Sequence, residues 1–93
     1  MNKNIHIFGG GTVSYIANHL ALSAPAYGST ARRIAELCEE RFGGKLDVKL
    51  ELTNMALGGH GPLNTLEDIK GRIAELVDSP LTKIIFFSCA IVD

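Results

Sequence analysis

Three glycines followed by a threonine, Gly9-Gly10-Gly11-Thr12, form the segment of this chain best suited to contact an anionic ligand. They come directly after the short apolar run Ile5 to Phe8, which predicts a strand buried on both faces. Because glycine has no Cβ, the backbone amides of such a turn can approach a phosphate closely, with the Thr12 hydroxyl as an added donor. Two interpretations stand side by side: phosphate or nucleotide contact, or a plain tight turn.

A second set of free amides is expected at Gly28-Ser29-Thr30, where a helix begins with its positive dipole end. Two familiar phosphate motifs are absent. The sequence contains no GxxxxGK[ST], and it contains no GxGxxG because Thr12, Val13 and Ser14 follow Gly11. A kinase-type phosphate loop and a classical dinucleotide site are therefore disfavoured.

Hydrophobic periodicity predicts the elements that position these loops. From Ser29 to about Phe42 the apolar residues recur at helical spacing, with Ser29 or Thr30 as the cap and Gly43-Gly44 as the stop. Lys45 to Thr53 alternates apolar and polar residues, which predicts an edge strand with one face in water. Residues 13–27 show no steady period and predict mostly loop, with a short helix around Tyr15 to Leu20.

The second half of the chain gives clearer signals. Residues 54–64 are rich in glycine and predict a loop, and Thr65-Leu66-Glu67-Asp68 matches a capping box ahead of a helical stripe. Asp78-Ser79-Pro80 ends that helix. Lys83 to Cys89 is apolar on both faces, which predicts a central strand.

This order of elements predicts an α/β fold of three layers, a parallel Rossmann-like βαβαβ sheet with right-handed crossovers and helices on both sides. Residues 1–93 are expected to form a single Rossmann-like nucleotide-binding domain, or the N-terminal portion of one, so that the nucleotide-binding fold is incomplete. In an open parallel sheet, ligands bind beyond the carboxyl ends of the strands. Three loops should converge there: residues 9–27, 54–64 and 90–93.

Composition excludes several classes of protein. A hydrophobic fraction of 46% against 20% charged residues excludes intrinsic disorder, and a net charge of -1 gives no basic surplus for binding nucleic-acid backbones. The chain has no signal-peptide core and no apolar stretch near the roughly 20 residues of a membrane helix, so a cytoplasmic protein is expected. Cys38 and Cys89 lie far apart without a CxxC, which predicts no metal or redox site.

Several segments together resemble the synthetase domain of coenzyme A biosynthesis, phosphopantothenate–cysteine ligase. They are Gly9-Gly10-Gly11-Thr12, Tyr15-Ile16-Ala17-Asn18-His19, the helix opening at Gly28, and Ser88-Cys89-Ala90-Ile91-Val92-Asp93. The resemblance spans nearly the whole chain at the level of motifs. It implies a dimer that uses CTP or ATP with Mg²⁺ to activate the carboxylate of 4'-phosphopantothenate as an acyl nucleotide, which the amine of cysteine then attacks.

The resemblance also implies roles for individual residues. Gly10, Gly11 and Thr12, with Gly9 before them, would cradle phosphates, and Asn18 would orient the acyl-nucleotide intermediate as the catalytic residue. The remaining nucleotide-binding positions that it implies are His19, Gly28, Ser29, Ala90 and Asp93. From the residues alone, a loop or helix cap is the favoured interpretation of Asn18, whereas for His19 a nucleotide contact and a turn cap both stay open.

The chain departs from the family at two points. Leu20 to Tyr27 replaces a shorter Ser-Ser-Gly-Lys segment and lacks its basic residue, and the lysine-rich segment of the family would fall beyond Asp93. The strand predicted over Lys83 to Cys89 is of the central type but has no outer neighbour in this sequence. A second polypeptide segment or a homodimer partner is therefore expected to complete the site. The chain is then expected to be a truncated or cleaved N-terminal piece.

Other polar residues have simpler explanations. His60 lies in the binding-edge loop, where it is the histidine best placed to contact a ligand, but an exposed loop residue without a role is the favoured interpretation. His6 is interpreted as a satisfied residue of the first strand, and Arg32 as the surface partner of Glu36. Two further functions stay open beside the ligase. One is a non-catalytic nucleotide-binding module, and the other is an interaction subunit that another chain completes.

Overall fold

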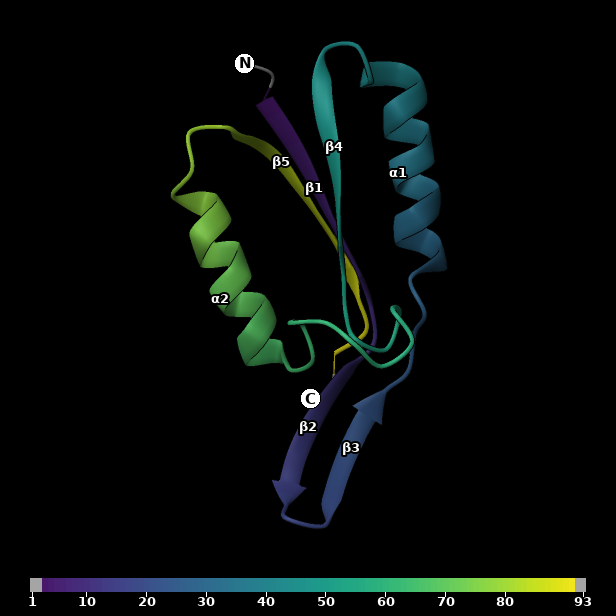
Figure 1. Ribbon diagram of the computed structural model, residues 1–93, viewed down its shortest axis with the longest axis vertical. Helices are drawn as coiled ribbons and strands as arrows, with labels where there is room; N and C mark the ends of the chain where they lie inside the picture. Colours follow the sequence, from purple (N-terminus) through teal and green to yellow (C-terminus); the bar gives the residue numbers. More distant parts are fainter. Residues whose placement is uncertain (1–2, 92–93) are drawn as a thin grey trace.

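The computed structural model describes residues 3–91, which form a three-stranded sheet, two helices and a separate hairpin (Figure 1). The elements in chain order are β1 (Lys3–Gly10), β2 (Thr12–Ala17), β3 (Leu20–Ala24), α1 (Ser29–Phe42), β4 (Leu46–Leu52), α2 (Leu66–Val77) and β5 (Thr82–Cys89). The sheet order is β4-β1-β5, and both pairings of β1 are parallel. The expected α/β architecture with a parallel sheet is therefore confirmed.

The two helices cover opposite faces of the sheet, because alternate residues of β1 point to opposite sides (Figure 1). Ile5 and Ile7 are fully buried in a cluster with the inner residues of α1, whereas Phe8 is buried with those of α2. The α1 contribution consists of Ala31, Ala35 and Cys38, and the α2 contribution of Ile69 and Leu76. The core is thus two thin apolar layers that share the central strand.

The capping box predicted for the second helix is present. The Thr65 hydroxyl accepts a hydrogen bond from the Asp68 amide at 3.2 Å, and the Asp68 carboxylate accepts one from the Thr65 amide at 3.0 Å. These backbone hydrogen bonds, given by the amides of Thr65 and Asn64, favour the ionised carboxylate and lower the pKa of Asp68. The start of α2 is therefore fixed by local chemistry that is visible in the sequence.

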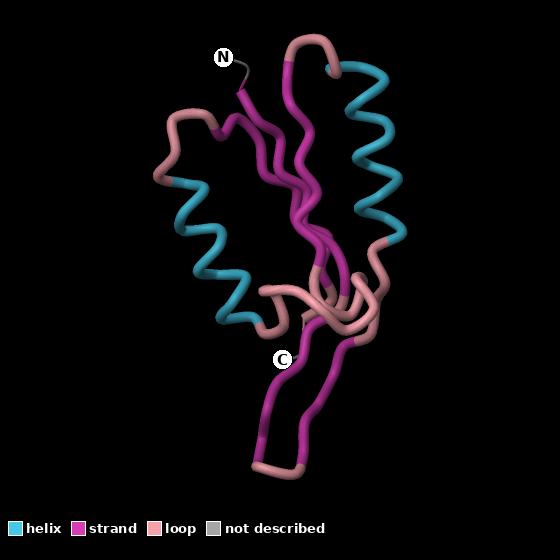
Figure 2. The backbone as a smooth tube through the Cα atoms, viewed as in Figure 1, coloured by secondary structure: helices cyan, strands magenta, loops and turns pink. Residues whose placement is uncertain are grey.

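The loop predicted for residues 13–27 is wrong over much of its length. Residues 12–24 form the antiparallel hairpin β2-β3, in which Thr12 pairs with Ala24 and Tyr15 with Ala21. Figure 2 shows this hairpin projecting away from the sheet and the helices. The Thr, Val, Tyr and Ile residues of β2 favour extended backbone, but a hairpin that leaves both faces largely in solvent lacks the alternation that identifies strands.

The central position predicted for the third strand of the sheet is also wrong. β1 is the central strand, and β5 lies at the edge opposite β4. β5 pairs with β1 only, and although Ile85 and Cys89 pack in the cluster under α2, Ile84, Phe86 and Phe87 keep more than a third of their surface exposed. An apolar run on both faces marks a strand that is buried in a larger sheet, and in this chain β5 has one neighbour.

Gly9 sets the spacing between β1 and α1. A Cβ placed on Gly9 would overlap the Cβ of Ala31, which itself is fully buried. Two backbone segments can approach this closely only where side chains are absent or minimal. The first turn of α1 therefore packs directly on the carboxyl end of the central strand.

We expect Gly9→Ala to lower the free energy of unfolding by about 1–3 kcal/mol, because the helix must move away from the sheet to admit the methyl group. Gly71→Ala is the matched control: Gly71 lies within α2, and nothing lies within 4 Å of the position that its methyl group would take. Alanine there should raise stability by about 1 kcal/mol through helix propensity. Urea unfolding measures both changes, and equal effects at the two glycines would contradict the close packing.

Candidate functional site

The carboxyl ends of the parallel strands meet at one edge of the sheet, where β1 and β5 lie side by side. From β1 the chain proceeds to α1 on one face, while the connection into β5 runs through α2 on the other face (Figure 1). Such a reversal between neighbouring strands is a topological switch point, the place where open α/β sheets bind their ligands. The expected convergence of the first loop and the segment after β5 therefore occurs here.

Direct hydrogen bonds join the two segments at the switch point. The Ala90 amide donates to the Gly10 carbonyl at 3.0 Å, and the Thr12 hydroxyl donates to the Ala90 carbonyl at 2.8 Å. Thr12 is only 2% exposed, so its side chain is part of the protein interior. Ala90 and Thr12 are thus brought together as expected, but the hydroxyl already has a protein acceptor.

The other glycines of the turn also have protein neighbours. The Gly11 amide donates to the Ala26 carbonyl at 2.8 Å, and a Cβ on Gly11 would collide with the Ala24 carbonyl. A Cβ on Gly10, whose φ is 110°, would collide with the Thr53 hydroxyl. Close contacts within the protein therefore explain why positions 10 and 11 require glycine.

The start of α1 offers a different set of donors. Gly28 is the N-cap residue, with a left-handed φ of 82°, and no side chain caps the helix. The expectation that Ser29 or Thr30 caps it is wrong, since both residues lie inside the helix, where they are exposed. The first turn also contains no acidic residue. The amides of this turn thus have no side-chain acceptor at the cap.

Arg32 ties two loops to the same helix start. Its guanidinium donates to the carbonyl of Tyr27 and to that of Ala56, the latter at 2.9 Å. The predicted surface pair with Glu36 is wrong, because Glu36 accepts from Arg33 at 2.9 Å instead. A positive charge therefore lies beside the open turn of α1.

Asn18 and His19 form the turn at the tip of the hairpin. Six residues of extended β2 at about 3.3 Å each place Asn18 about 20 Å from the glycine turn. Within one chain, the structure therefore does not bring Asn18 or His19 to Gly10 or to the start of α1. Asp93, the last of the expected site residues, lies outside the described residues.

A small cavity of about 360 Å³ lies next to the switch point. Residues 12–15 of β2 line one side, and residues 65–67 at the start of α2 line the other. The Asn64 amide group donates to the Tyr15 hydroxyl at 2.8 Å, which holds the hairpin against the loop before α2. Such a cavity has room for a small group rather than for a whole nucleotide.

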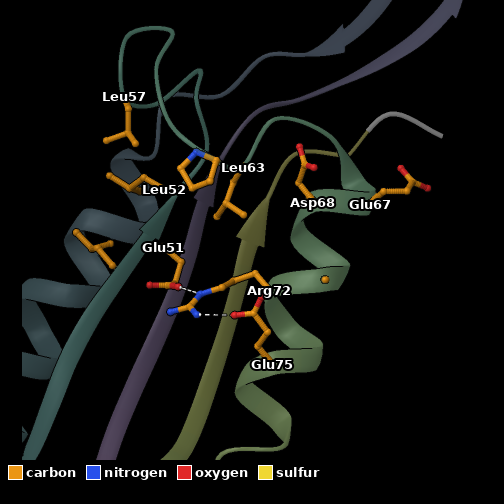
Figure 3. A pocket seen from close by; sticks show the side chains of 11 residues that line it. Glu51, Leu52, Leu57, Leu63, Glu67, Asp68, Arg72 and Glu75 are labelled. Carbon is orange, nitrogen blue, oxygen red and sulfur yellow. Dashed lines mark hydrogen bonds and ion pairs between the residues drawn. The ribbon is translucent and has the colours of Figure 1, made fainter.

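A larger groove of about 940 Å³ runs between β4 and α2 (Figure 3). Arg72 of α2 reaches across it to Glu51 of β4 and also donates to Glu75 at 3.2 Å. Leucines from β4 and from the following loop form its apolar wall: Leu50, Leu52, Leu57 and Leu63. This groove was not predicted from the sequence. The one related signal is the alternation of polar residues with leucines along β4, which is interpreted as the water-facing side of an edge strand.

His6 lies near the Arg72–Glu51 ion pair. Its interpretation as a residue with satisfied hydrogen bonds is wrong. His6 is 4% exposed, its Nδ1 is 3.9 Å from a Glu51 carboxylate oxygen, and neither ring nitrogen makes a hydrogen bond among the described residues. Burial lowers the pKa of His6 most strongly, and the positive charges of Arg72 and Lys49 lower it further against the opposing effect of Glu51. The predicted exposure of His60 is confirmed.

In comparisons with known proteins, no family model, curated protein or solved structure matches this chain. Neither helix in residues 3–91 has the length and apolar character that a membrane span requires. The case for a function therefore depends on the geometry of the switch point and of the start of α1.

We expect the stability of this protein to fall as the pH drops below about 6.5. The unfolded chain binds a proton at His6 near its ordinary pKa, whereas the folded protein holds the ring neutral to lower pH, so protonation favours unfolding. Urea unfolding at pH 7.5, 6.5 and 5.5 measures the slope, which His6→Gln should reduce. His60→Gln in the exposed loop is the control; an unchanged slope in His6→Gln would contradict the assignment.

Proposed function

We propose that this chain is a Rossmann-like nucleotide-binding unit whose phosphate site is the uncapped start of α1. One observation carries the proposal: the packing of Gly9 on Ala31 places the first turn of α1 directly over the carboxyl end of β1. This is the place where dinucleotide- and phosphate-binding α/β proteins hold their anions. The arrangement is kept here although the β2-β3 hairpin is inserted between strand and helix.

The electrostatics of this turn suit an anion. Ser29 and Thr30 are exposed residues, and the helix dipole adds a partial positive charge at the same point. Arg32 lies within the first turn, with its guanidinium held on the carbonyls of Tyr27 and Ala56. In this proposal Gly9, Gly10, Gly11 and Thr12 shape the site, while Gly28 and Ser29 contact the phosphate.

The ligand would be a nucleoside triphosphate, CTP or ATP, accompanied by Mg²⁺. The described residues contain no cluster of three or more metal-ligating side chains, so the cation would be held chiefly by the phosphates. In a more specific form, the proposal adds a reaction to nucleotide binding: activation of 4'-phosphopantothenate as an acyl nucleotide for amide formation with cysteine. It rests on the motif resemblance, and the position of Asn18 at the hairpin tip means that a single chain does not assemble that site.

A role as an interaction subunit is the second candidate, and the edge strand β5 favours it. Ile84, Phe86 and Phe87 are each more than a third exposed, and Lys83 is the only charged residue of the strand. Exposed apolar edges without charges are the places where sheets accept further strands. A cytoplasmic location would suit both candidates, because both cysteines are free thiols.

Calorimetric titration with CTP and with ATP, each with Mg²⁺, tests the phosphate site. We expect Ser29→Asp to weaken nucleotide binding at least tenfold, because its carboxylate would compete for the helix amides and repel the phosphates. The same substitution should leave helix stability unchanged or slightly raised, which separates lost binding from lost folding.

Ser79→Asp adds the same charge beyond the far end of α2 and serves as the control. It should leave the affinity within about twofold, since surface charges at such separation are screened. Nucleotide binding that is absent in the native chain, or equal in the native chain and Ser29→Asp, would overturn the phosphate site.

A further inference from the structure

The groove between β4 and α2 has the size and the lining of a small-molecule site. Its volume of about 940 Å³ lies within the range of about 300–1,000 Å³ that is typical of ligand pockets. The leucines of its apolar wall are partly in contact with solvent, since Leu50 and Leu57 are 40% and 48% exposed. The groove involves α2, which covers the opposite face of the sheet from α1, so it is separate from the phosphate site proposed at the start of α1 (Figure 1).

A glycine in the middle of α2 keeps one wall of the groove open. Gly71 lines the groove between Glu67 and Glu75, which lie one turn before it and one turn after it on the same stripe of the helix. Glycine is unfavourable inside a helix, and no close neighbour requires it here, because nothing lies within 4 Å of the position of its Cβ. The helix therefore leaves free space beside the polar residues of the groove.

The polar residues give the groove an acidic character. Among the described residues that line it, Glu51, Glu67, Asp68 and Glu75 are acidic, and Arg72 is the only basic one. The Glu51 side chain is only 13% exposed, so its charge is screened less by salt than the charges on the surface. The lining therefore favours a cation over an anion.

A buried histidine leaves part of this polar surface without a partner. Neither ring nitrogen of His6 makes a hydrogen bond among the described residues, and Nδ1 faces the Glu51 carboxylate at 3.9 Å, too far for a hydrogen bond. Buried polar groups without partners are rare in folded proteins. Burial lowers the pKa of His6, so the ring is neutral near pH 7 and one of its nitrogens can accept a hydrogen bond.

Arg72 has a second acceptor and can leave Glu51. Its guanidinium crosses the groove to Glu51 and also donates to Glu75 of its own helix (Figure 3). Because the Glu75 side chain is 71% exposed, Arg72 keeps this partner when it turns toward solvent. The Glu51 carboxylate is then free to bind a different cation next to His6.

We propose that this groove binds a small molecule with a protonated amine and an apolar body, the amine replacing Arg72 at Glu51. The ammonium donates to the Glu51 carboxylate and to the neutral ring of His6. The apolar body lies along the leucines that gather above the ion pair in Figure 3: Leu52, Leu57 and Leu63. Exchange of one cation for another keeps the charge of Glu51 compensated, whereas a neutral or anionic ligand leaves it unpaired.

Three probes with the same apolar body and different head groups test the choice of ligand. They are phenethylamine, phenethyl alcohol and hydrocinnamate, added to the isotope-labelled native chain at pH 7.5 and followed by NMR. The amine should bind at least about tenfold more tightly than the other two, because only its head group pairs with Glu51. It should shift the amide resonances of residues 50–52 and 71–75. Equal binding of the three probes, or amine shifts confined to other residues, would overturn the proposal.

Filling the notch at Gly71 tests the place of binding. Gly71→Leu puts a side chain into the groove and should abolish phenethylamine binding, while the helix gains a better helix former. Gly44→Leu is the matched control, since Gly44 lies in the turn between α1 and β4 and also has nothing within 4 Å of its Cβ position. Circular dichroism confirms that both variants fold. Native amine affinity in Gly71→Leu, or the same loss in both variants, contradicts a site in the groove.

The role of Glu51 is tested by a substitution that keeps its shape. Glu51→Gln should weaken phenethylamine binding at least about tenfold and leave the weak binding of phenethyl alcohol unchanged, because only the charged head group needs the carboxylate. Glu39→Gln removes a charge from the exposed surface of α1 and should leave both affinities unchanged. An amine affinity in Glu51→Gln equal to that of the native chain would remove Glu51 from the site.

The exchange with Arg72 makes a prediction of the opposite sign. Arg72→Met keeps a long apolar side chain but removes the competing guanidinium, so phenethylamine should bind at least about threefold more tightly than to the native chain. The resonances of the His6 ring, identified by their loss in His6→Gln, should shift when the amine binds. A lower amine affinity in Arg72→Met, or a His6 ring that does not respond, would refute the exchange.

Discussion

The contact between the carboxyl end of β1 and the first turn of α1 is the constraint on which the rest of the structure depends. Gly9 lets Ala31 lie against the strand, and Gly28 turns the chain into the helix through a left-handed conformation. With the helix fixed there, Ile5 and Ile7 are sealed on one face of the sheet. The same contact leaves the open end of the helix at the edge where parallel sheets bind ligands.

Sequence periodicity predicts the parts of the fold that bury one face. The helical stripe from Ser29 and the capping box at Thr65 are confirmed, and so is the edge strand β4. The predicted water-facing side of β4 is only partly confirmed, because Glu51 is less exposed than Leu50. The hairpin was not predicted, because most of its residues are exposed and its sequence therefore lacks the alternation of apolar and polar residues that marks a half-buried strand. The candidate site was predictable only in part: the converging loops follow from strand order, but which donors already have acceptors depends on contacts between distant residues.

The sheet face toward α2 carries a polar cluster built on one carboxylate. Glu51 is mostly buried and forms an ion pair with Arg72. Its other carboxylate oxygen lies near the neutral ring of His6. An unpaired buried imidazole costs stability, and a protonated one costs more. This small polar cluster lies on the α2 side of the sheet, which makes the interior under α2 more sensitive to acid than the interior under α1.

The hydrogen bond from Thr12 to Ala90 joins residues 78 positions apart in the chain. Among the described strands β1 is synthesised first, but β5, which pairs with its second edge, follows both helices in the chain. Pairing between such distant segments is slow, because the loop must close before the contacts stabilise it. The edge of β1 that pairs with β5 therefore stays open until both helices have been synthesised, and in that interval the nascent chain is vulnerable to misassociation and suited to chaperone binding.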